Sequence, residues 1–477
     1  MLIFKKITMR HSFKYLLFVA PIVYFTSCKK FLDTPQQSQL SLSNFWQTAN
    51  DAELGVAAIY SAAQVAFEIN YWRWGELRAD NFINNDRPNA NNSQIVTNQL
   101  TSATAGADWS ELYKAVLTAN VAIKKIPDIP DFASKNNLLA EAYALRAMCY
   151  FYAVRVWGEV PKITEPVEGL DQDLNFTRSP VEEIYDEIIL PDVQKAEQLI
   201  TVEKSINRIS LGAILALKAD IYMWPGKHRD YTVASNAITQ IEGLGYALED
   251  NQAAWINIFK GPENSKEIVF ALGWNFNEDG GNSGVGQFST ATTEFVCSED
   301  LEQKWNGKIP GDFRILATGA FDVEIVPGVE FPYLRILTKY SPRFSTRDEQ
   351  SSWSNTNDRD ILFYRLSGLL LLKAEAENYL DHPDVALSLI NRIRTARGLP
   401  LVDTTLTDKT LIRDMILDDR QFELMGEGHR YWDLVRNNVV LDVMEPINGM
   451  NNPQRIFWPV SQNVLNRNAG IIQNESY

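Results

Sequence analysis

Apolar residues recur every three or four positions between residues 138 and 156, which is the spacing of an α-helix. One face carries Leu138, Ala142, Leu145, Met148 and Tyr152, and the other carries Leu139, Ala144, Ala147, Phe151 and Val154. Both faces favour burial, which is typical of a central helix. Gly158 and Pro161 predict its end. We expect Arg146 and Arg155 to pair with carboxylates, because an unpaired buried charge is costly.

The same spacing predicts more helices before and after this one. They cover residues 51–67, 109–126, 181–200 with an irregularity at Pro191, 210–224, 231–241, 360–380, 383–397 and 408–426, and a last helix begins near His429. A strand is predicted at 267–272. Residues 71–100 and 273–355 carry scattered aromatic and amide side chains without a regular period. Long aperiodic segments of this kind are often functional.

Two parts of the chain resemble each other weakly. Residues 215–222 match residues 371–377, and a short turn and an Ala-x-x-x-Ile helix follow each of them. This echo predicts a mainly α fold of degenerate tetratricopeptide-like helix pairs, interrupted by a large irregular insertion containing short strands.

The first 27 residues have the pattern of a targeting segment and not of a fold. Four basic residues precede an apolar run at 15–25, which is shorter than the roughly 20 residues that span a bilayer. Small residues then lead into Cys28, which predicts a lipoprotein signal peptide (1–27), acylation of Cys28 and a polar tether (28–44) before a single domain (45–477). An ordinary secretory signal with a chance cysteine is the alternative.

Net charge and cysteine content indicate which partners are disfavoured and whether disulfide bonds are expected. The net charge of −15 becomes −19 once the four basic residues of the signal peptide leave, which argues against nucleic acid as a partner. Cys149 and Cys297 have no framework spacing and are predicted to be core thiols.

Catalytic motifs are not evident. The chain has no HExxH, CxxC or EF-hand pattern. The charge-dense stretch 420–436 has opposite charges three residues apart (Arg420/Glu423, Glu427/Arg430 and Asp433/Arg436), which favours a structural ion-pair network over an active site. The sequence leaves open a glycosidase pair of carboxylates, whose geometry is spatial, and a structural Ca²⁺ near residues 277–282.

Several motifs together resemble one family. They are Cys28-Lys29-Lys30-Phe31-Leu32-Asp33, Phe45-Trp46, Leu145-Arg146-Ala147, Gly158-Glu159-Val160-Pro161, the run from Asp419 to Arg436, Trp458-Pro459-Val460 and Gln473-Asn474. In this order the chain resembles the SusD/RagB family of outer-membrane nutrient-binding lipoproteins. Asp419 stands where the family usually has Glu, and Glu475-Ser476 where it often has Pro-Gly.

The resemblance implies a lipoprotein facing the cell exterior, with about four tetratricopeptide-like helix pairs and no catalytic activity. It would bind an oligosaccharide or polysaccharide and deliver it to a TonB-dependent, SusC-like transporter. Capture of a peptide or glycopeptide on the same scaffold is the alternative. No cofactor is implied.

Sugar binding needs aromatic faces for the apolar side of a pyranose ring and polar groups for its hydroxyls. The segment 71–87 has both, and its candidates are Trp72, Trp74, Arg78, Asp80, Asn81 and Asn84. By analogy with the family, the central insertion adds Trp274, Trp305, Tyr340 and Trp353. For each aromatic residue the alternative is core packing, and Trp72, Trp74 and Asp80 could seat their segment on the helices.

Overall fold

The computed structural model describes residues 45–84, 90–167, 175–285, 295–308, 312–314, 337, 339–340 and 358–477. By its contacts the chain divides into Met1–Phe45 and Trp46–Tyr477, and the second unit holds the elements named here. Its helices are α1 (Ala49–Phe67), α2 (Asn70–Gly75), α3 (Ala90–Val96), α4 (Ser110–Lys125), α5 (Lys135–Trp157), α6 (Val181–Ile184), α7 (Leu190–Leu199), α8 (Leu211–Met223), α9 (Tyr231–Gly243), α10 (Gln252–Lys260), α11 (Phe276–Asp279), α13 (Glu299–Lys308), α16 (Leu366–Tyr379), α17 (Pro383–Ala396), α18 (Lys409–Leu424), α19 (Arg430–Arg436), α20 (Val440–Asn448) and α21 (Gln462–Arg467). Its strands are β1 (Phe82–Asn84), β2 (Val160–Pro161), β3 (Arg178–Ser179), β4 (Ile268–Leu272), β5 (Phe295–Cys297) and β6 (Ile361–Arg365).

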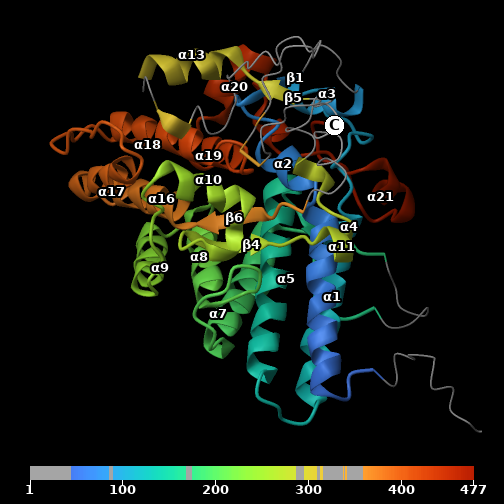
Figure 1. Cartoon of the computed structure of the whole chain (residues 1–477). Coiled ribbons are helices and arrows are strands. Elements are labelled where there is room, and N and C mark those ends of the chain that lie inside the picture. The colour runs from blue at the N-terminus through green and yellow to red at the C-terminus, as the bar shows by residue number, and fades with distance from the viewer. Residues whose placement is uncertain are drawn as a thin grey trace, which may run out of the picture. The chain divides into compact units, whose positions relative to one another are not determined.

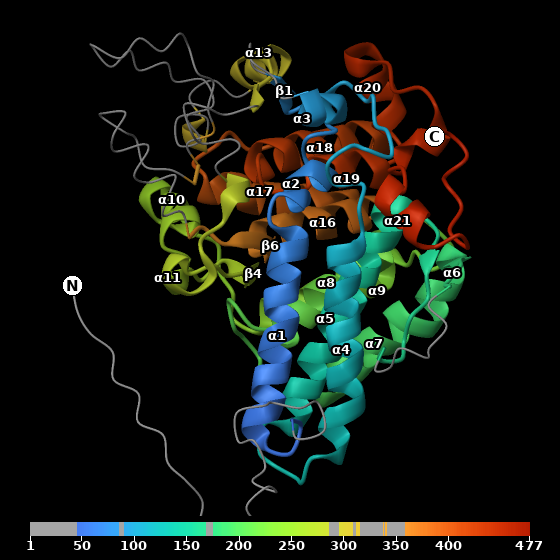
Figure 2. The ribbon, with the colours of Figure 1, turned by 90° about the vertical axis from the view of Figure 1, so that its right-hand side faces the viewer.

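Helix α5 is the central helix that the sequence predicts. It packs against α1, α4 and α7, and nearly all of its last two-thirds is buried (Figures 1 and 2). Gly158, with φ at +75°, ends it in a conformation that other residues rarely adopt. Arg146 pairs with Asp192 at 2.7 Å, as expected of a buried charge.

Arg155 is held in a cage on the same helix. Its guanidinium pairs with Asp220 at 3.2 Å and lies 4.1 Å and 4.3 Å from the ring centres of Phe151 and Tyr152. Trp224 and Trp432 close the other sides. Cation–π contacts therefore replace much of the hydration that the charge loses on burial.

The fold is mainly α, as predicted. Consecutive helices pack against each other as α4 with α5, α8 with α9 and α16 with α17, and α16 also packs against α9 and α18. This arrangement of neighbouring pairs is consistent with a stack of helical hairpins. The tetratricopeptide-like detail stays a prediction.

The prediction of one helix over residues 360–380 is wrong at its start. Residues 361–365 form strand β6, which pairs antiparallel with β4, and α16 begins only at Leu366. All five strand residues are buried, and the short run of apolar and aromatic residues at 361–364 does not distinguish a strand from a buried helix.

Of two predicted irregularities, the structure replaces one by regular elements and confirms the other. The segment 71–100, predicted as irregular, contains α2, β1 and α3. The irregularity predicted at Pro191 is confirmed as a π-turn over Tyr185–Ile189 immediately before α7. A proline ring clashes with the carbonyl four residues earlier, and the wider turn relieves that clash.

Cys149 and Cys297 are both buried and free, as predicted for core thiols. Among the described residues no helix is long and apolar enough to cross a membrane. Cys28, the signal peptide and the tether lie outside the described residues.

Candidate functional site

The two tryptophans predicted to stack on a sugar are packed inside the protein. Trp72 and Trp74 lie on α2 and are each 1% exposed. The indole N–H of Trp72 donates to the carbonyl of Gly426 at 2.8 Å, and that of Trp74 donates to the carbonyl of Gly106 at 2.9 Å. Neither ring offers a face to a ligand in this structure, so the prediction that they form a binding platform is corrected.

The polar candidates of this segment also make their hydrogen bonds and ion pairs within the protein. Arg78 is fully buried and donates to the carbonyls of Ile456 and Arg455 at 2.7 and 2.6 Å. Asp80 pairs with Arg430 through two hydrogen bonds of 2.7 and 2.8 Å.

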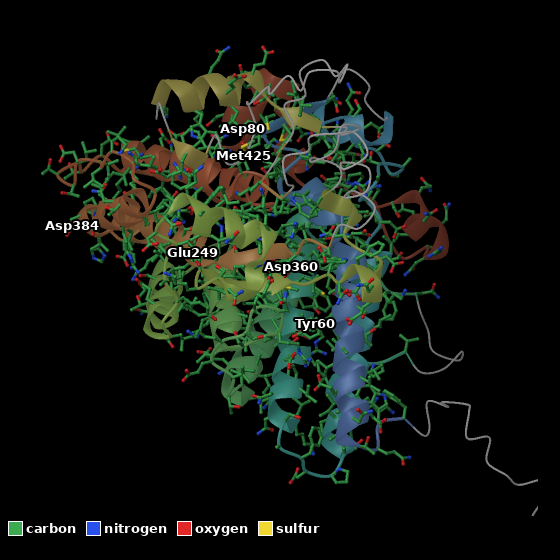
Figure 3. All side chains as sticks on the ribbon, in the orientation of Figure 1. Tyr60, Asp80, Glu249, Asp360, Asp384 and Met425 are labelled. Carbon is green, nitrogen blue, oxygen red and sulfur yellow. The ribbon has the colours of Figure 1, made fainter. Side chains whose placement is uncertain are left out.

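The amides of the segment follow the same pattern. Asn81 donates to Glu76 at 2.6 Å, and Asn84, half-buried on β1, donates to Ser93 at 3.1 Å. Trp72 and Asp80 thus attach the segment to the corner between α18 and α19, where Figure 3 labels Asp80 and Met425. This is the alternative that the sequence left open for Trp72, Trp74 and Asp80.

The candidates of the central insertion are buried as well. Trp305 has no exposed surface, stacks on Phe422 at 4.8 Å and donates to Asp312 at 3.0 Å. Tyr340 donates to the carbonyl of Gly426 at 3.0 Å and is 2% exposed. Trp274 is 9% exposed. Trp353 lies outside the described residues.

A buried network of charged side chains, called here the hub, links the central insertion and the residues that flank it to helix α18. Arg365 donates to Glu427 at 2.7 Å, to Glu423 at 2.7 Å and to Glu267 at 2.8 Å. The hub consists of Glu267, Asp312, Arg314, Lys339, Arg365, Arg397, Glu423 and Glu427. Burial alone would raise the pKa of Glu423, but three arginines outweigh it and hold that pKa well below its usual value.

The charge-dense stretch 420–436 forms a structural ion-pair network, as predicted, but with other pairings than the helix spacing predicts. Of the three expected pairs, Asp433/Arg436 forms, at 2.7 Å. Arg420 pairs with Asp433 and Arg430 pairs with Asp80. Because helix α18 ends at Leu424, Glu427 and Arg430 do not share one helix. Glu423 lies within α18 but pairs with the arginines of the hub instead of Arg420.

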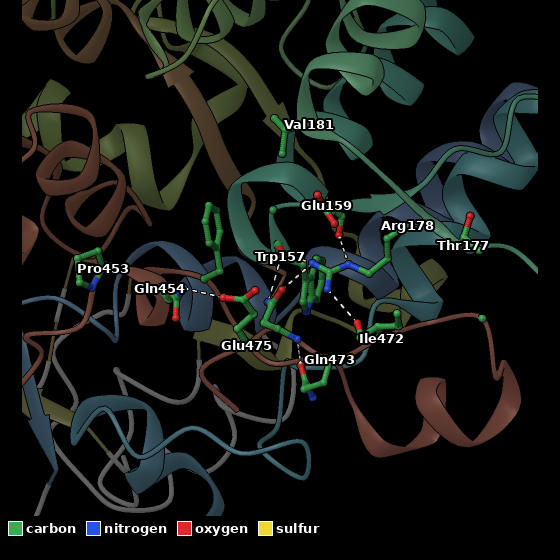
Figure 4. Close-up of a pocket in the computed structure, with 14 residues that line it drawn as sticks. Trp157, Glu159, Thr177, Arg178, Val181, Pro453, Gln454, Ile472, Gln473 and Glu475 are labelled. Carbon is green, nitrogen blue, oxygen red and sulfur yellow. Dashed lines mark hydrogen bonds between the residues drawn. The ribbon is translucent and has the colours of Figure 1, made fainter.

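An open pocket of about 640 Å³ lies beside the end of α5, and we name it the Arg178 pocket (Figure 4). Three segments build it: residues 157–159, residues 177–181 and residues 453–475. Gly158 turns the chain out of α5, and the pairing of β2 with β3 returns Arg178 to the same place.

Arg178 holds the walls of this pocket together. Its Nε donates to the carbonyl of Glu159 at 2.7 Å, and its two terminal nitrogens donate to the carbonyls of Ile472 and Trp157 at 2.9 and 3.0 Å. A fourth bond of 2.6 Å reaches the side-chain oxygen of Asn474. Burial lowers the pKa of Arg178 from its ordinary value, and its contacts are to neutral oxygens.

The rest of the lining is part apolar and part polar. Phe457 and Val181 are half-buried, and Ile472 is 76% exposed. Gln454 donates to Glu475 at 2.8 Å. Such a mixture of apolar surface and a few polar groups is typical of a site for a small polar ligand.

Sequence reasoning did not select this pocket. The motifs Gly158-Glu159-Val160-Pro161 and Gln473-Asn474 entered only as family markers, although both line or border it. No local signal links the two motifs, because about 310 residues separate them in the sequence.

The described residues contain no group of three or more His, Cys, Asp or Glu side chains that could hold a metal ion. The calcium site near residues 277–282 stays a prediction. Asp279 there accepts hydrogen bonds from Gln64 and from the amide of Asn275, which are contacts within the protein.

Comparisons with known proteins agree with this architecture. A family model described as "SusD family" matches residues 330–452, and one described as "Starch-binding associating with outer membrane" matches residues 30–223. SusD-like protein P38 of Formosa agariphila is 34% identical over 94% of this chain and 96% of its own length. SusD-like protein P25 of the same organism is 24% identical over 92% and 91%.

Solved structures share the fold. A laminarin binding SusD-like protein superposes with a TM-score of 0.72 at 20% identity, covering 90% of this chain and all of its own. NanU of B. fragilis superposes with a TM-score of 0.75 at 20% identity, covering 92% and 99%. One of these neighbours is described as binding laminarin, and one of the family models is described as starch-binding and as associating with the outer membrane. This chain belongs to the SusD family.

Proposed function

We propose that this protein is a lipoprotein that captures an oligosaccharide or polysaccharide outside the outer membrane and passes it to a TonB-dependent, SusC-like transporter. It binds its cargo and does not alter it. Acylated Cys28 anchors it in the outer-membrane lipid.

The observation that carries the proposal is full-length similarity to a SusD-like protein, at 34% identity over 94% of the chain. The family descriptions add starch binding and outer-membrane association, and one structural neighbour is a laminarin binding protein. In the charge-dense stretch, which could have been an active site, Glu423 and Glu427 are paired inside the hub and Asp433 is paired with Arg420 and Arg436. These findings support binding over catalysis.

Calorimetric titration tests the binding. The mature protein, made soluble by Cys28→Ala, is titrated with a panel of neutral and acidic oligosaccharides and with a panel of peptides. We expect heat of binding with at least one glycan and no release of products. Binding of peptides without any glycan would favour the peptide alternative, and turnover of a glycan would refute the non-catalytic assignment.

Anchoring is tested separately by fractionation. We expect wild-type protein in the outer-membrane fraction and Cys28→Ala in the soluble fraction, because the acyl chains are the predicted attachment. Equal membrane retention of both proteins would show that Cys28 is not the anchor.

A further inference from the structure

The Arg178 pocket has the properties of a built site for a sugar. Its volume of about 640 Å³ lies within the range of about 300–1,000 Å³ that is typical of ligand pockets. Three segments of the chain form it, and the half-buried side chain of Arg178 fixes them with four hydrogen bonds. A fixed wall of this kind binds with little loss of conformational freedom.

The apolar part of the pocket is exposed to solvent, and a bound ligand would cover it. Ile472 is 76% exposed, more than any other large apolar side chain in the described part of the chain. Its carbonyl is fixed by Arg178, so its position is set by the scaffold. The ring of Phe457 lies close to Gly158, where a Cβ would stand 3.6 Å from the ring. These surfaces suit the apolar face of a pyranose ring.

The polar part of the pocket is rich in acceptors. Arg178 commits four of its hydrogen bonds to oxygens of the protein, so its charge faces carbonyl groups. Glu159 and Glu475 are exposed carboxylates on the lining, and Glu475 also accepts from Gln454. Carboxylates accept hydrogen bonds from hydroxyls and repel other anions.

We propose that the Arg178 pocket binds an uncharged sugar unit of the glycan. Phe457 and Ile472 lie against the apolar face of the sugar, and Glu159 and Glu475 accept hydrogen bonds from its hydroxyls. The assignment rests on the proposed function and adds to it a location and a substrate class. Uronic acids and sulfated sugars are disfavoured there, because their charge meets two carboxylates.

Titration of site variants tests the location. The soluble mature protein is titrated with α-1,4-linked and β-1,3-linked glucose tetrasaccharides and with a galacturonic acid tetrasaccharide. We expect Phe457→Ala and Ile472→Asp each to weaken binding of the neutral tetrasaccharide about tenfold or more. Leu401→Asp is the matched control, because Leu401 is also an exposed aliphatic residue, at 63%, and does not line the pocket.

The Ile472→Asp variant separates a loss of binding from a loss of folded structure. The side chain is largely in solvent, so the substitution should leave the thermal unfolding midpoint near that of the wild type, whereas Phe457→Ala removes a half-buried ring. Loss of binding by Ile472→Asp with an unchanged midpoint supports the assignment.

Charge reversal tests the substrate class. We expect Glu475→Lys to weaken the neutral tetrasaccharide and to gain affinity for the galacturonate tetrasaccharide, while Glu111→Lys on the exposed face of α4 changes neither. Preference of the wild type for the galacturonate ligand overturns the assignment. So does neutral binding that neither pocket variant affects. In both cases the proposed function stands, and it fails only if no glycan of a wider panel binds.

Discussion

The buried carboxylate of Glu76 allows a sharp test of how α2 is held on the α18–α19 corner. It accepts hydrogen bonds from the amides of Gly426 and Gly428, at 3.0 and 2.9 Å, and from the side chain of Asn81 at 2.6 Å. Burial outweighs these bonds and the charge of Lys339, and it raises the pKa of Glu76 from 4.5 to about 7. The folded protein therefore keeps this proton over a pH range in which the unfolded chain has lost it.

The sign of the pH dependence follows from that shift. A raised pKa in the folded state stabilises the fold fully below the unfolded value of 4.5, and the contribution is lost as the pH rises through about 7. Between about pH 5 and about pH 7, the wild type should lose ~2 kcal/mol of unfolding free energy from this group. Glu76→Gln carries no such proton. We expect its stability relative to the wild type to improve by ~2 kcal/mol over that range.

The variant also carries a constant penalty. Its amide places N–H donors where Glu76 has an oxygen, so the amide of Gly428 loses its acceptor, which costs about 1–3 kcal/mol at every pH. This offset does not alter the slope. Urea unfolding, followed by tryptophan fluorescence at a series of pH values, measures both quantities.

The exposed substitution Glu111→Gln serves as the control and should run parallel to the wild type. Parallel curves for Glu76→Gln and the wild type would refute the reasoning, because they would mean that the hydrogen bonds and Lys339 keep the carboxylate charged. A change in the opposite direction would refute it more strongly.

Two further substitutions test the packing of the scaffold. Gly75→Ala should destabilise the protein by about 2 kcal/mol or more, because its Cβ would lie 1.9 Å from the carbonyl oxygen of Gly428. A Cβ at Gly243 meets nothing within 4 Å, so Gly243→Ala should be neutral in the same urea titration. Arg155→Met should cost about 3–5 kcal/mol, since Asp220 is left buried without its cation, and Asp220→Asn in the same background should recover part of that loss. Recovery of nothing would mean that the cage of rings, and not the ion pair, holds Arg155.

The helical part of the fold could be predicted from the sequence because period and caps agree there. Helix α5 followed from the apolar spacing and its end from Gly158 and Pro161, and the cost of burying an unpaired charge gave Arg146 and Arg155 their carboxylate partners. The identity of those partners did not, since Asp192 and Asp220 lie on other helices. Strand β6 was missed because its five residues are all buried and carry no period.

The candidate site was predicted less well, for a physical reason. Composition identifies aromatic and amide side chains but not the side of a segment that faces solvent. Trp72 and Trp305 have the chemistry of a stacking platform, yet their N–H groups find partners inside the protein, at Gly426 and Asp312. The Arg178 pocket depends on the meeting of residues near 158 with residues near 473, which no local pattern records.

The hub has a consequence for how this scaffold can change over evolution. Arg314 pairs with Glu423 of α18, and Lys339 donates to the carbonyl of Glu423 and to the carboxylate of Glu427, so the two ends of the chain between them are held in place whatever that chain contains. The entropy of closing a loop between fixed ends grows slowly, by about 0.6 kcal/mol for each doubling of its length. Mutation can therefore lengthen, shorten or rewrite the intervening sequence at small energetic cost, while the helical scaffold stays unchanged.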